Sequence, residues 1–319
     1  MNKKILKFSA LLLCTALAFG ACKKKDSTPS DDTSSETTTA QDQANYSSAS
    51  NQSAEEADVA FSGSPSTART TSASGQTIMG VTIDSTYIAN GTFILRYSGV
   101  GFCGKARTGS DSIVLKNGPW HTQGAQLISY YNYTIINRNG KKMTLVGIDT
   151  ITNVSGGNML TLAAANTTSD SLVRYHTGTA TITFDDGTVR TWSHDRQRVK
   201  FYSNGVLTNK ITGLKTFPLL GINGIEAWGI NRNDEPFYGQ IVTPLLWAYT
   251  IGETSNCTYG FPYSGSYKHR SIASGLEVTF GVDQTGNPVA YTPYIENCPS
   301  DIKLDWTHSS KSMQAIIGY

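Results

Sequence analysis

The chain has 319 residues, a formal net charge of +2 at pH 7 and 16% charged residues. Residues 77–319 carry 19 basic and 16 acidic side chains with no basic cluster, a balance that argues against nucleic acid as a partner. This segment is long enough to bury a sizeable hydrophobic core.

The N-terminal residues have the organisation of a secretory signal peptide. Three lysines precede an apolar run, Phe8–Phe19, which is shorter than the roughly 20 residues that span a bilayer as a helix. A basic start, a short apolar core and small residues at its end are typical of a cleaved signal. We therefore expect residues 1–21 to be a signal peptide; the lysines are Lys3, Lys4 and Lys7.

The signal ends in Gly20-Ala21-Cys22. Two small residues before a cysteine resemble the lipobox of bacterial lipoproteins, in which that cysteine is lipidated. Phe19 departs from this pattern, which usually has a small or aliphatic residue there. A plain cleavage site beside a chance cysteine is the alternative. We predict lipidation of Cys22, because it stands where a lipobox has its acceptor cysteine. Two or three acyl chains on this cysteine would anchor the protein stably, where one chain is marginal.

Residues 22–76 are rich in Ser, Thr, Asp, Gln and Ala, with almost no large apolar side chains. Such a composition cannot offset the entropy lost on ordering. Ser53-Ala54-Glu55-Glu56, followed by the apolar residues of 59–61, is a capping-box pattern that predicts one or two helical turns. We therefore expect a largely disordered tether that joins the lipid anchor to the folded domain.

Residues 77–319 alternate β-type runs with turn dipeptides. Asn139-Gly140 and Asp186-Gly187 separate such runs, as expected of hairpins. We predict an all-β domain with mostly antiparallel sheets, built as a β-sandwich or an open barrel. Cys103 and Cys298 are each followed by a short strand pattern, which favours two related halves. The clearest strand patterns are 92–97, 112–115, 126–136, 179–184, 198–202 and 276–282.

The mature chain keeps Cys103, Cys257 and Cys298 besides the lipidated cysteine. An exported domain meets an oxidising compartment, so one disulfide is expected. We favour Cys257–Cys298, and the other two pairings remain open. A bridge across a loop of about 40 residues stabilises by a few kcal/mol in the loop-entropy model.

The sequence offers no catalytic constellation. The five histidines lack a metal-ligand spacing, and no nucleophile elbow or phosphate loop is present. His194 precedes Asp195, but neighbours on a strand point to opposite faces, so the pair predicts polar residues near a strand end and not a dyad. We expect no catalytic residue, no metal and no cofactor.

Aromatic residues are the more informative feature. Trp120 and Tyr263 stand beside Gly or Pro in expected loops, where an exposed ring with polar neighbours suits a sugar ligand. The alternative is that both rings fill the core. We take Trp120 and Tyr263 as candidate ligand-binding residues.

Several segments of 78–306 resemble a group of uncharacterised Bacteroidetes lipoproteins. The resemblance rests on Gly101–Ser110, Trp192–Arg198, Gly221–Gly229, Ile241–Leu246 before Cys257, and Gly260–Gly265 before a Val-Thr-Phe-Gly-Val-Asp hairpin and Cys298. Lys23-Lys24-Lys25-Asp26 after the cysteine is similar to the start of such lipoproteins. The resemblance implies attachment to the outer membrane, at its periplasmic face or at the cell surface. It implies no activity.

Together these features favour a membrane-anchored binding module of the cell envelope, with a glycan as the leading ligand. A structural or assembly protein of the envelope and a hydrolase are the alternatives. The expected partners are the membrane, through the lipid, and a glycan or an envelope protein.

Overall fold

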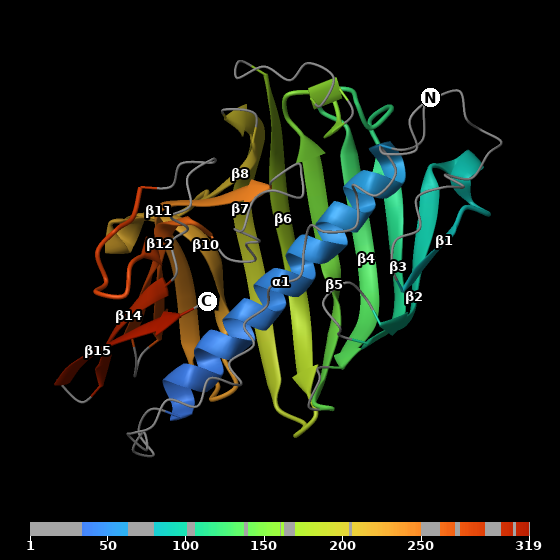
Figure 1. Ribbon diagram of the computed structural model, residues 1–319. Coiled ribbons are helices and arrows are strands. Elements are labelled where there is room, and N and C mark those ends of the chain that lie inside the picture. Colours follow the sequence, from blue (N-terminus) through green and yellow to red (C-terminus); the bar gives the residue numbers. More distant parts are fainter. Residues whose placement is uncertain are drawn as a thin grey trace.

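The computed structural model describes residues 34–62, 80–100, 106–136, 140–159, 161–162, 170–203, 206–249, 262–271, 275–290, 301–308 and 311–318. In these residues a long helix, α1 (Ser34–Ser62), lies across a sheet of fifteen strands (Figure 1). Every pair of neighbouring strands is antiparallel. The prediction of an all-β, antiparallel domain is confirmed.

The sheet follows the chain order closely. Strands β1 to β7 are neighbours in sequence order, β10 follows β7, and β10 to β15 again run in order; β8 pairs with β7 and β11, and β9 with β10. The strands are β1 (Val81–Asp84), β2 (Thr92–Val100), β3 (Ala106–Lys116), β4 (Gln126–Ile136), β5 (Lys142–Asn153), β6 (Ser171–Phe184), β7 (Val189–Ser203), β8 (Val206–Gly213), β9 (Lys215–Phe217), β10 (Ile222–Ile230), β11 (Pro236–Tyr249), β12 (Ser264–Ser271), β13 (Gly275–Val282), β14 (Asp301–His308) and β15 (Lys311–Gly318).

The predicted strand patterns lie inside observed strands, and the run 126–136 coincides with β4. Alternation of side chains explains the register, since Leu127 pairs with Ile151 and both are buried. The predicted Asp186-Gly187 turn joins β6 to β7, and Gly187 has the positive φ of 81° that this tight turn requires.

The largest hydrophobic cluster lies between α1 and one face of the sheet. Tyr46 and Phe61 of the helix pack there, with Phe61 edge-on to Phe93 of β2 at a centroid distance of 4.5 Å. All described strands belong to one sheet, so a helix covers this core where a sandwich would place a second sheet. Sheet residues of the cluster include Leu95, Ile113, Leu127, Leu145, Ile182 and Trp192.

The expectation of a disordered tether over 22–76 is wrong for Ser34–Ser62, and so is the expectation of only one or two helical turns. This segment contains no Gly and no Pro, and Tyr46, Ala49, Ser53 and Ala57 recur at helical spacing on its buried side. The stripe consists mainly of small residues, so it carries little hydrophobic signal. Packing against the sheet supplies the stability that such a helix lacks alone.

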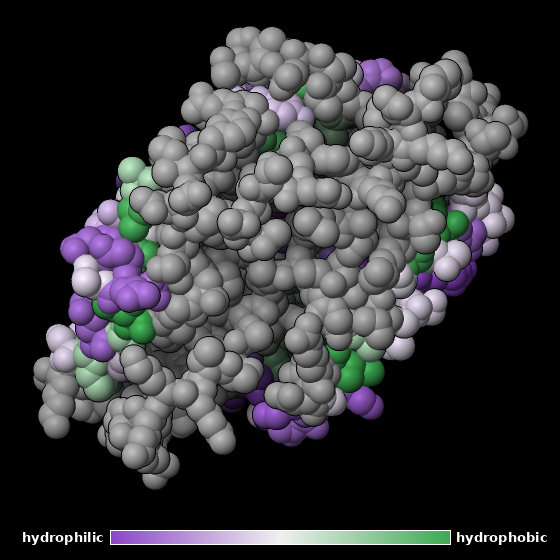
Figure 2. All heavy atoms as spheres, in the orientation of Figure 1, coloured by the Kyte–Doolittle hydropathy of each residue, from purple (hydrophilic) through white to green (hydrophobic). Residues whose placement is uncertain are grey.

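Residues 22–33 and 63–76 lie outside the described residues, as do Cys22, Cys103, Cys257 and Cys298. Lipidation, the Cys257–Cys298 disulfide and the duplication into two halves therefore stay predictions. In the described part of the chain, no helix has both the length and the apolar character needed to cross a membrane. Along the flanks of the molecule, coloured hydrophobic and hydrophilic residues are intermingled and do not gather into one apolar patch (Figure 2).

Candidate ligand-binding face beneath helix α1

The sheet side chains that point toward α1 form what we call the helix-covered face. On β7, alternate positions from 190 to 200 place one row of residues on this face, and each of them is buried. Arg196 is 2% exposed and Lys200 is 7% exposed. Cations at this depth require partners, because an unpaired buried charge is strongly destabilising. The row is Arg190, Trp192, His194, Arg196, Arg198 and Lys200.

The C-terminal half of α1 supplies carboxylates to these cations. Glu55 lies 2.9 Å from Arg198 Nη2 and 2.5 Å from Lys200 Nζ. Burial alone would raise the pKa of Glu55, but Lys200 and Arg198 hold it below its ordinary value overall. On the other side of the helix, Glu56 accepts two hydrogen bonds from Arg107 of β3, at 2.6 and 3.0 Å. The helix thereby bridges β7 to β3.

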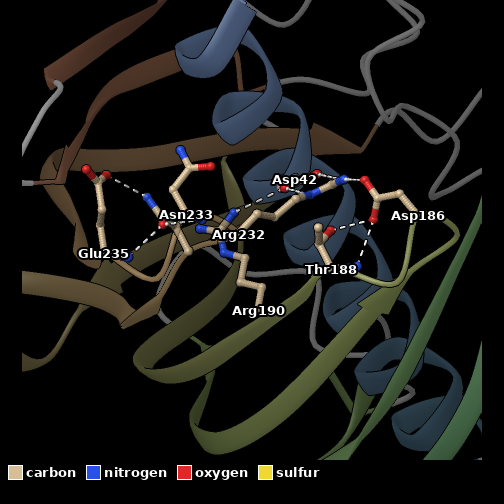
Figure 3. A network of polar contacts seen from close by, with 8 residues as sticks. Asp42, Asp186, Thr188, Arg190, Arg232, Asn233 and Glu235 are labelled. Carbon is tan, nitrogen blue, oxygen red and sulfur yellow. Dashed lines mark hydrogen bonds and ion pairs between the residues drawn. The ribbon is translucent and has the colours of Figure 1, made fainter.

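In the N-terminal half of α1, Asp42 contacts Arg232 in the β10–β11 turn and Arg190 of β7 (Figure 3). Arg232, in the β10–β11 turn, donates through Nε and Nη2 to both carboxylate oxygens of Asp42, each at 2.6 Å. Its Nη1 also donates to Asp186 in the β6–β7 turn at 3.2 Å. Arg190 lies 3.9 Å from Asp42, and burial lowers the pKa of this arginine to about 10. One helix carboxylate therefore holds two arginines.

The middle of the face holds a buried network of neutral and ionisable groups. His194 Nε2 lies 3.1 Å from the carboxylate of Asp149, and its Nδ1 lies 3.4 Å from the hydroxyl of Tyr46. Tyr46 and Tyr131 hydroxyls are 3.4 Å apart. Burial raises the pKa of Tyr46 well above its ordinary value of 10, whereas a nucleophile needs a lowered one. The arrangement suits structure and recognition rather than nucleophilic catalysis.

Asp195 faces away from this network, as strand alternation predicts, and the carboxylate beside His194 comes from β5 instead. The prediction that His194 sits near a strand end is wrong, because it lies in the middle of β7 and is buried. A long-range partner such as Asp149 leaves no local signature in sequence.

A second buried carboxyl group lies under the helix. Asp111 of β3 accepts hydrogen bonds from Ser53 of α1 at 2.7 Å and from Ser129 of β4 at 2.5 Å. Burial raises the pKa of Asp111 to about 6, against these two hydrogen bonds, which lower it. Asp111, which lies between α1 and the sheet, therefore changes its protonation near physiological pH.

The charges of the two sides are complementary. Among the described residues of this contact, the sheet and its turns supply seven cations and four carboxylates, and α1 supplies four carboxylates. The four helix carboxylates therefore more than offset the excess of three positive charges on the sheet. The cations are Arg107, Arg174, Arg190, Arg196, Arg198, Lys200 and Arg232; the carboxylates of the sheet and its turns are Asp111, Asp149, Asp186 and Glu226; those of α1 are Asp42, Glu55, Glu56 and Asp58.

Aromatic rings lie directly beside four of these cations. The guanidinium carbon lies 4.3 Å from the Tyr97 ring centre for Arg107, 4.8 Å from Trp120 for Arg174, 4.7 Å from Trp192 for Arg190, and 3.2 Å from Phe184 for Arg232. Cation–aromatic pairs of this kind present both charge and a flat apolar surface. The face is therefore charged and aromatic along its length.

The helix leaves part of the hydrogen-bonding capacity of this face unused. Buried nitrogens on it without a hydrogen-bond partner within the described residues include Arg174 Nε, His176 Nδ1, Trp192 Nε1, Arg196 Nε and Arg198 Nε. Most buried polar atoms in proteins are paired, so each such atom calls for an explanation.

The two aromatic residues singled out in the sequence occupy different places. Trp120 is 3% exposed, donates from Nε1 to Asp58 of α1 at 2.6 Å, and belongs to the helix-covered face. Tyr263 precedes β12, is half-buried, and burial raises its pKa above the ordinary value. In the sheet order, five strands separate β4, which follows Trp120, from β12. The two rings do not form one exposed platform.

Among the described residues, no three His, Cys, Asp or Glu side chains are grouped so that they could hold a metal ion. Comparisons of the chain with protein-family models and curated proteins, and of its fold with solved structures, find no match. The chemistry of the helix-covered face is therefore the basis for assigning a role.

Proposed function

We propose that this protein is a lipid-anchored binding module of the bacterial outer membrane, related to the uncharacterised Bacteroidetes lipoproteins, and that its ligand is a glycan. Cys22 carries the anchor, and the helix-covered face of the sheet carries the ligand.

The observation that supports this proposal is the composition of that face. A core that never opens is ordinarily built from aliphatic side chains, since burying ion pairs gains little stability over hydrophobic packing. Here the buried row on β7 holds four cations together with Trp192 and His194, beside the aliphatic residues of the same face. Aromatic surface combined with convergent polar groups is the usual composition of a site for a partly apolar, hydroxyl-rich ligand.

The test is a screen of the mature chain, with Cys22→Ser to keep it free of lipid, against a broad panel of polysaccharides. Lys200→Gln removes one cation from the helix-covered face. Lys210→Gln is the matched control, because Lys210 pairs in register with Val199 and so lies on the opposite face. We expect the Lys200 variant to bind more weakly, but by less than the roughly tenfold value of one charged hydrogen bond, because the lost contact with Glu55 also loosens α1. No binding to any polysaccharide would contradict the proposal.

The anchor is tested separately in the producing cell. Wild-type protein should incorporate labelled fatty acid and sediment with the outer membrane, and Cys22→Ser should do neither. A Cys22→Ser protein that still sediments with the membrane would refute lipid anchoring.

A structural role in envelope assembly is the second candidate, and the observation behind it is the end of the sheet. Strand β15 pairs with β14 alone among the described strands, so one of its edges is open to pairing with another chain. A partner that copurifies with the protein and protects the β15 amides from hydrogen exchange would favour this role.

A further inference from the structure

We infer that the glycan is a polyanion, a carboxylated polysaccharide of the polyuronate type, and that it binds the helix-covered face in place of α1. This inference rests on the proposed function. It adds the chemical class of the ligand and the step by which the ligand reaches the face, the separation of α1 from the sheet.

The first argument is charge. Without α1 the helix-covered face and its turns have seven cations against four carboxylates, and when α1 is docked, in what we call the closed state, its four carboxylates offset this excess. Asp42 lies in the N-terminal half of the helix, and Glu55, Glu56 and Asp58 lie together near its C-terminal end, so the counter-charge falls in two groups. An extended polymer with carboxylates along its length can reach both groups, whereas a neutral glycan leaves the cations unpaired.

The second argument is that the contact between α1 and the sheet is suited to separation. The buried side of α1 consists mainly of Ala, Ser and acidic residues, with Tyr46 and Phe61 as the large rings. The helix side of this contact tolerates water, because polar interfaces resemble ordinary protein surface, whereas permanent ones resemble a divided hydrophobic core. The sheet side also holds aliphatic residues of the largest hydrophobic cluster, so opening exposes them and the bound polymer must cover them again. A helix of this composition is marginal by itself, which lowers the free energy needed to separate it from the sheet.

The third argument distinguishes a polysaccharide from an acidic peptide. His176 Nδ1, Trp192 Nε1 and Arg196 Nε have no partner in the described structure, while Asn51 Oδ1 and Glu55 Oε1 of α1 also lack a hydrogen bond, so the acceptors of the helix are not placed to meet these donors. Sugar hydroxyl and ring oxygens supply acceptors between the carboxylates. The Tyr97, Trp120 and Trp192 rings beside Arg107, Arg174 and Arg190 match a polymer in which each carboxylate is joined to a sugar ring.

Helix α1 then acts as a tethered competitor. The apparent dissociation constant equals the intrinsic constant divided by the fraction of open molecules. A substitution in α1 that loosens docking tenfold should therefore tighten ligand binding tenfold while the closed state still predominates. If α1 were a permanent part of the core, the same substitution would weaken binding or leave it unchanged.

The experiment measures binding of the mature chain, with Cys22→Ser, to polygalacturonate and to its fully methyl-esterified, uncharged form. Glu55→Gln removes the carboxylate beside Arg198 and Lys200, and Ser50→Ala removes the milder contact with Arg196 Nη2 at 2.8 Å. Asp195→Asn is the control, because it adds the same charge on the outward side of β7 without touching α1. Hydrogen exchange of α1 is followed in each complex.

We expect polygalacturonate to bind and its ester to bind at least tenfold more weakly. Glu55→Gln should bind about tenfold tighter than wild type, Ser50→Ala severalfold tighter, and Asp195→Asn within twofold. Exchange in α1 should rise on binding while that of β7 falls. Should Glu55→Gln not fold, Ser50→Ala carries the same test.

Three results would overturn the inference, and they differ from the result that would contradict the proposed function. Equal binding of the ester would make the ligand a neutral glycan. Unchanged exchange in α1, or weaker binding by both helix variants, would make α1 a fixed part of the core. Binding of poly-L-glutamate or oligothymidylate as tight as that of polygalacturonate would exclude a preference for sugars. Absence of binding to every polysaccharide would contradict the proposed function itself.

Discussion

Arg107 on β3 and Glu56 on α1 form a buried, two-pronged ion pair, with both carboxylate oxygens accepting from the guanidinium at 2.6 and 3.0 Å. Burial alone would lower the pKa of Arg107, but the bonds to Glu56 raise it overall. We predict that Glu56→Gln lowers the free energy of unfolding by about 3–5 kcal/mol, because it leaves Arg107 buried without its counter-ion. Urea denaturation of the mature chain measures this.

The paired variant Glu56→Leu with Arg107→Met separates the ion pair from simple packing. Replacing both partners leaves no unpaired charge, so its loss should be smaller than that of Glu56→Gln alone. A larger loss for the double variant would show that packing at this position, and not the charge, holds the helix.

Asp111 gives the helix contact a pH dependence. Its pKa is about 6 in the folded chain and about 3.8 when unfolded, so the folded state holds the proton more tightly. Its favourable contribution is complete below about pH 4 and is lost as the pH rises through 6. Asp111→Asn should therefore match wild type at pH 4 and be more stable at pH 7 by up to about 3 kcal/mol.

Unfolding in urea at pH 4, 5, 6 and 7 tests this prediction. Asp84 is the control of opposite sign, since hydrogen bonds from Thr86 and Arg96 lower its pKa to about 2. The stability contribution of Asp84 is complete above about pH 4 and is lost only as the pH falls toward 2, so the difference between Asp84→Asn and wild type should stay nearly constant over this series. If both variants shifted in the same direction, the burial of Asp111 would not be the cause.

His269 gives stability the opposite dependence on pH to that of Asp111. Its ring stacks on Phe237 at 5.3 Å, and burial, followed by repulsion from Arg190 and Arg270, lowers its pKa to about 3. The buried neutral ring stabilises above pH 6.5, and this contribution is lost as the pH falls toward 3. His269→Phe keeps the stack and should reduce the acid-side slope of stability by about 1.4 kcal/mol per pH unit.

The slope is read from the same urea series, with His121→Phe in the exposed β3–β4 loop as the control. Burial and the cations of β7 also lower the pKa of His176, so part of the slope should remain. An unaltered slope in His269→Phe would mean that this ring is not buried as a neutral base.

Much of the sheet could be predicted from sequence because its signals are local. The run 126–136 is β4, and Asp186-Gly187 is the turn that joins β6 to β7. Period-two alternation and turn dipeptides need no knowledge of distant residues. That is why strand positions, and the antiparallel class, followed from the residues alone.

The helix and the site could not be predicted in this way. The buried stripe of α1 is mostly Ala and Ser, which does not stand out in a polar segment. On β7, both sets of alternate positions are largely polar, so alternation gives no sign that Arg196 and Arg198 face inward. Arg198 pairs with Glu55, about 140 positions away, whereas Arg196 pairs with Glu226 of β10 and with the hydroxyl of Ser50 on α1. Only the tertiary structure brings these groups together.

Gly178 of β6 provides the last prediction, because it makes room for His194. A Cβ atom at position 178 would lie 2.7 Å from His194 Cε1 and 2.6 Å from the carbonyl oxygen of Ile148. The carbonyl belongs to the neighbouring strand and cannot turn aside, so the histidine ring must move and its contact with Asp149 must lengthen. Gly178→Ala should cost about 2–3 kcal/mol through overpacking and the strained hydrogen bond.

Gly140→Ala is the matched control. Gly140 has a φ of 77°, but a Cβ atom at this position would meet no described atom within 4 Å, so the substitution costs only the left-handed backbone conformation, about 1 kcal/mol. The imidazole proton resonances of His194 should shift in Gly178→Ala and stay in place in Gly140→Ala. Because His194 also contacts Tyr46 of α1, hydrogen exchange in the helix should rise in the first variant alone. Equal stabilities for the two variants would show that the sheet yields at position 178, and that His194 is not held as tightly as its contacts imply.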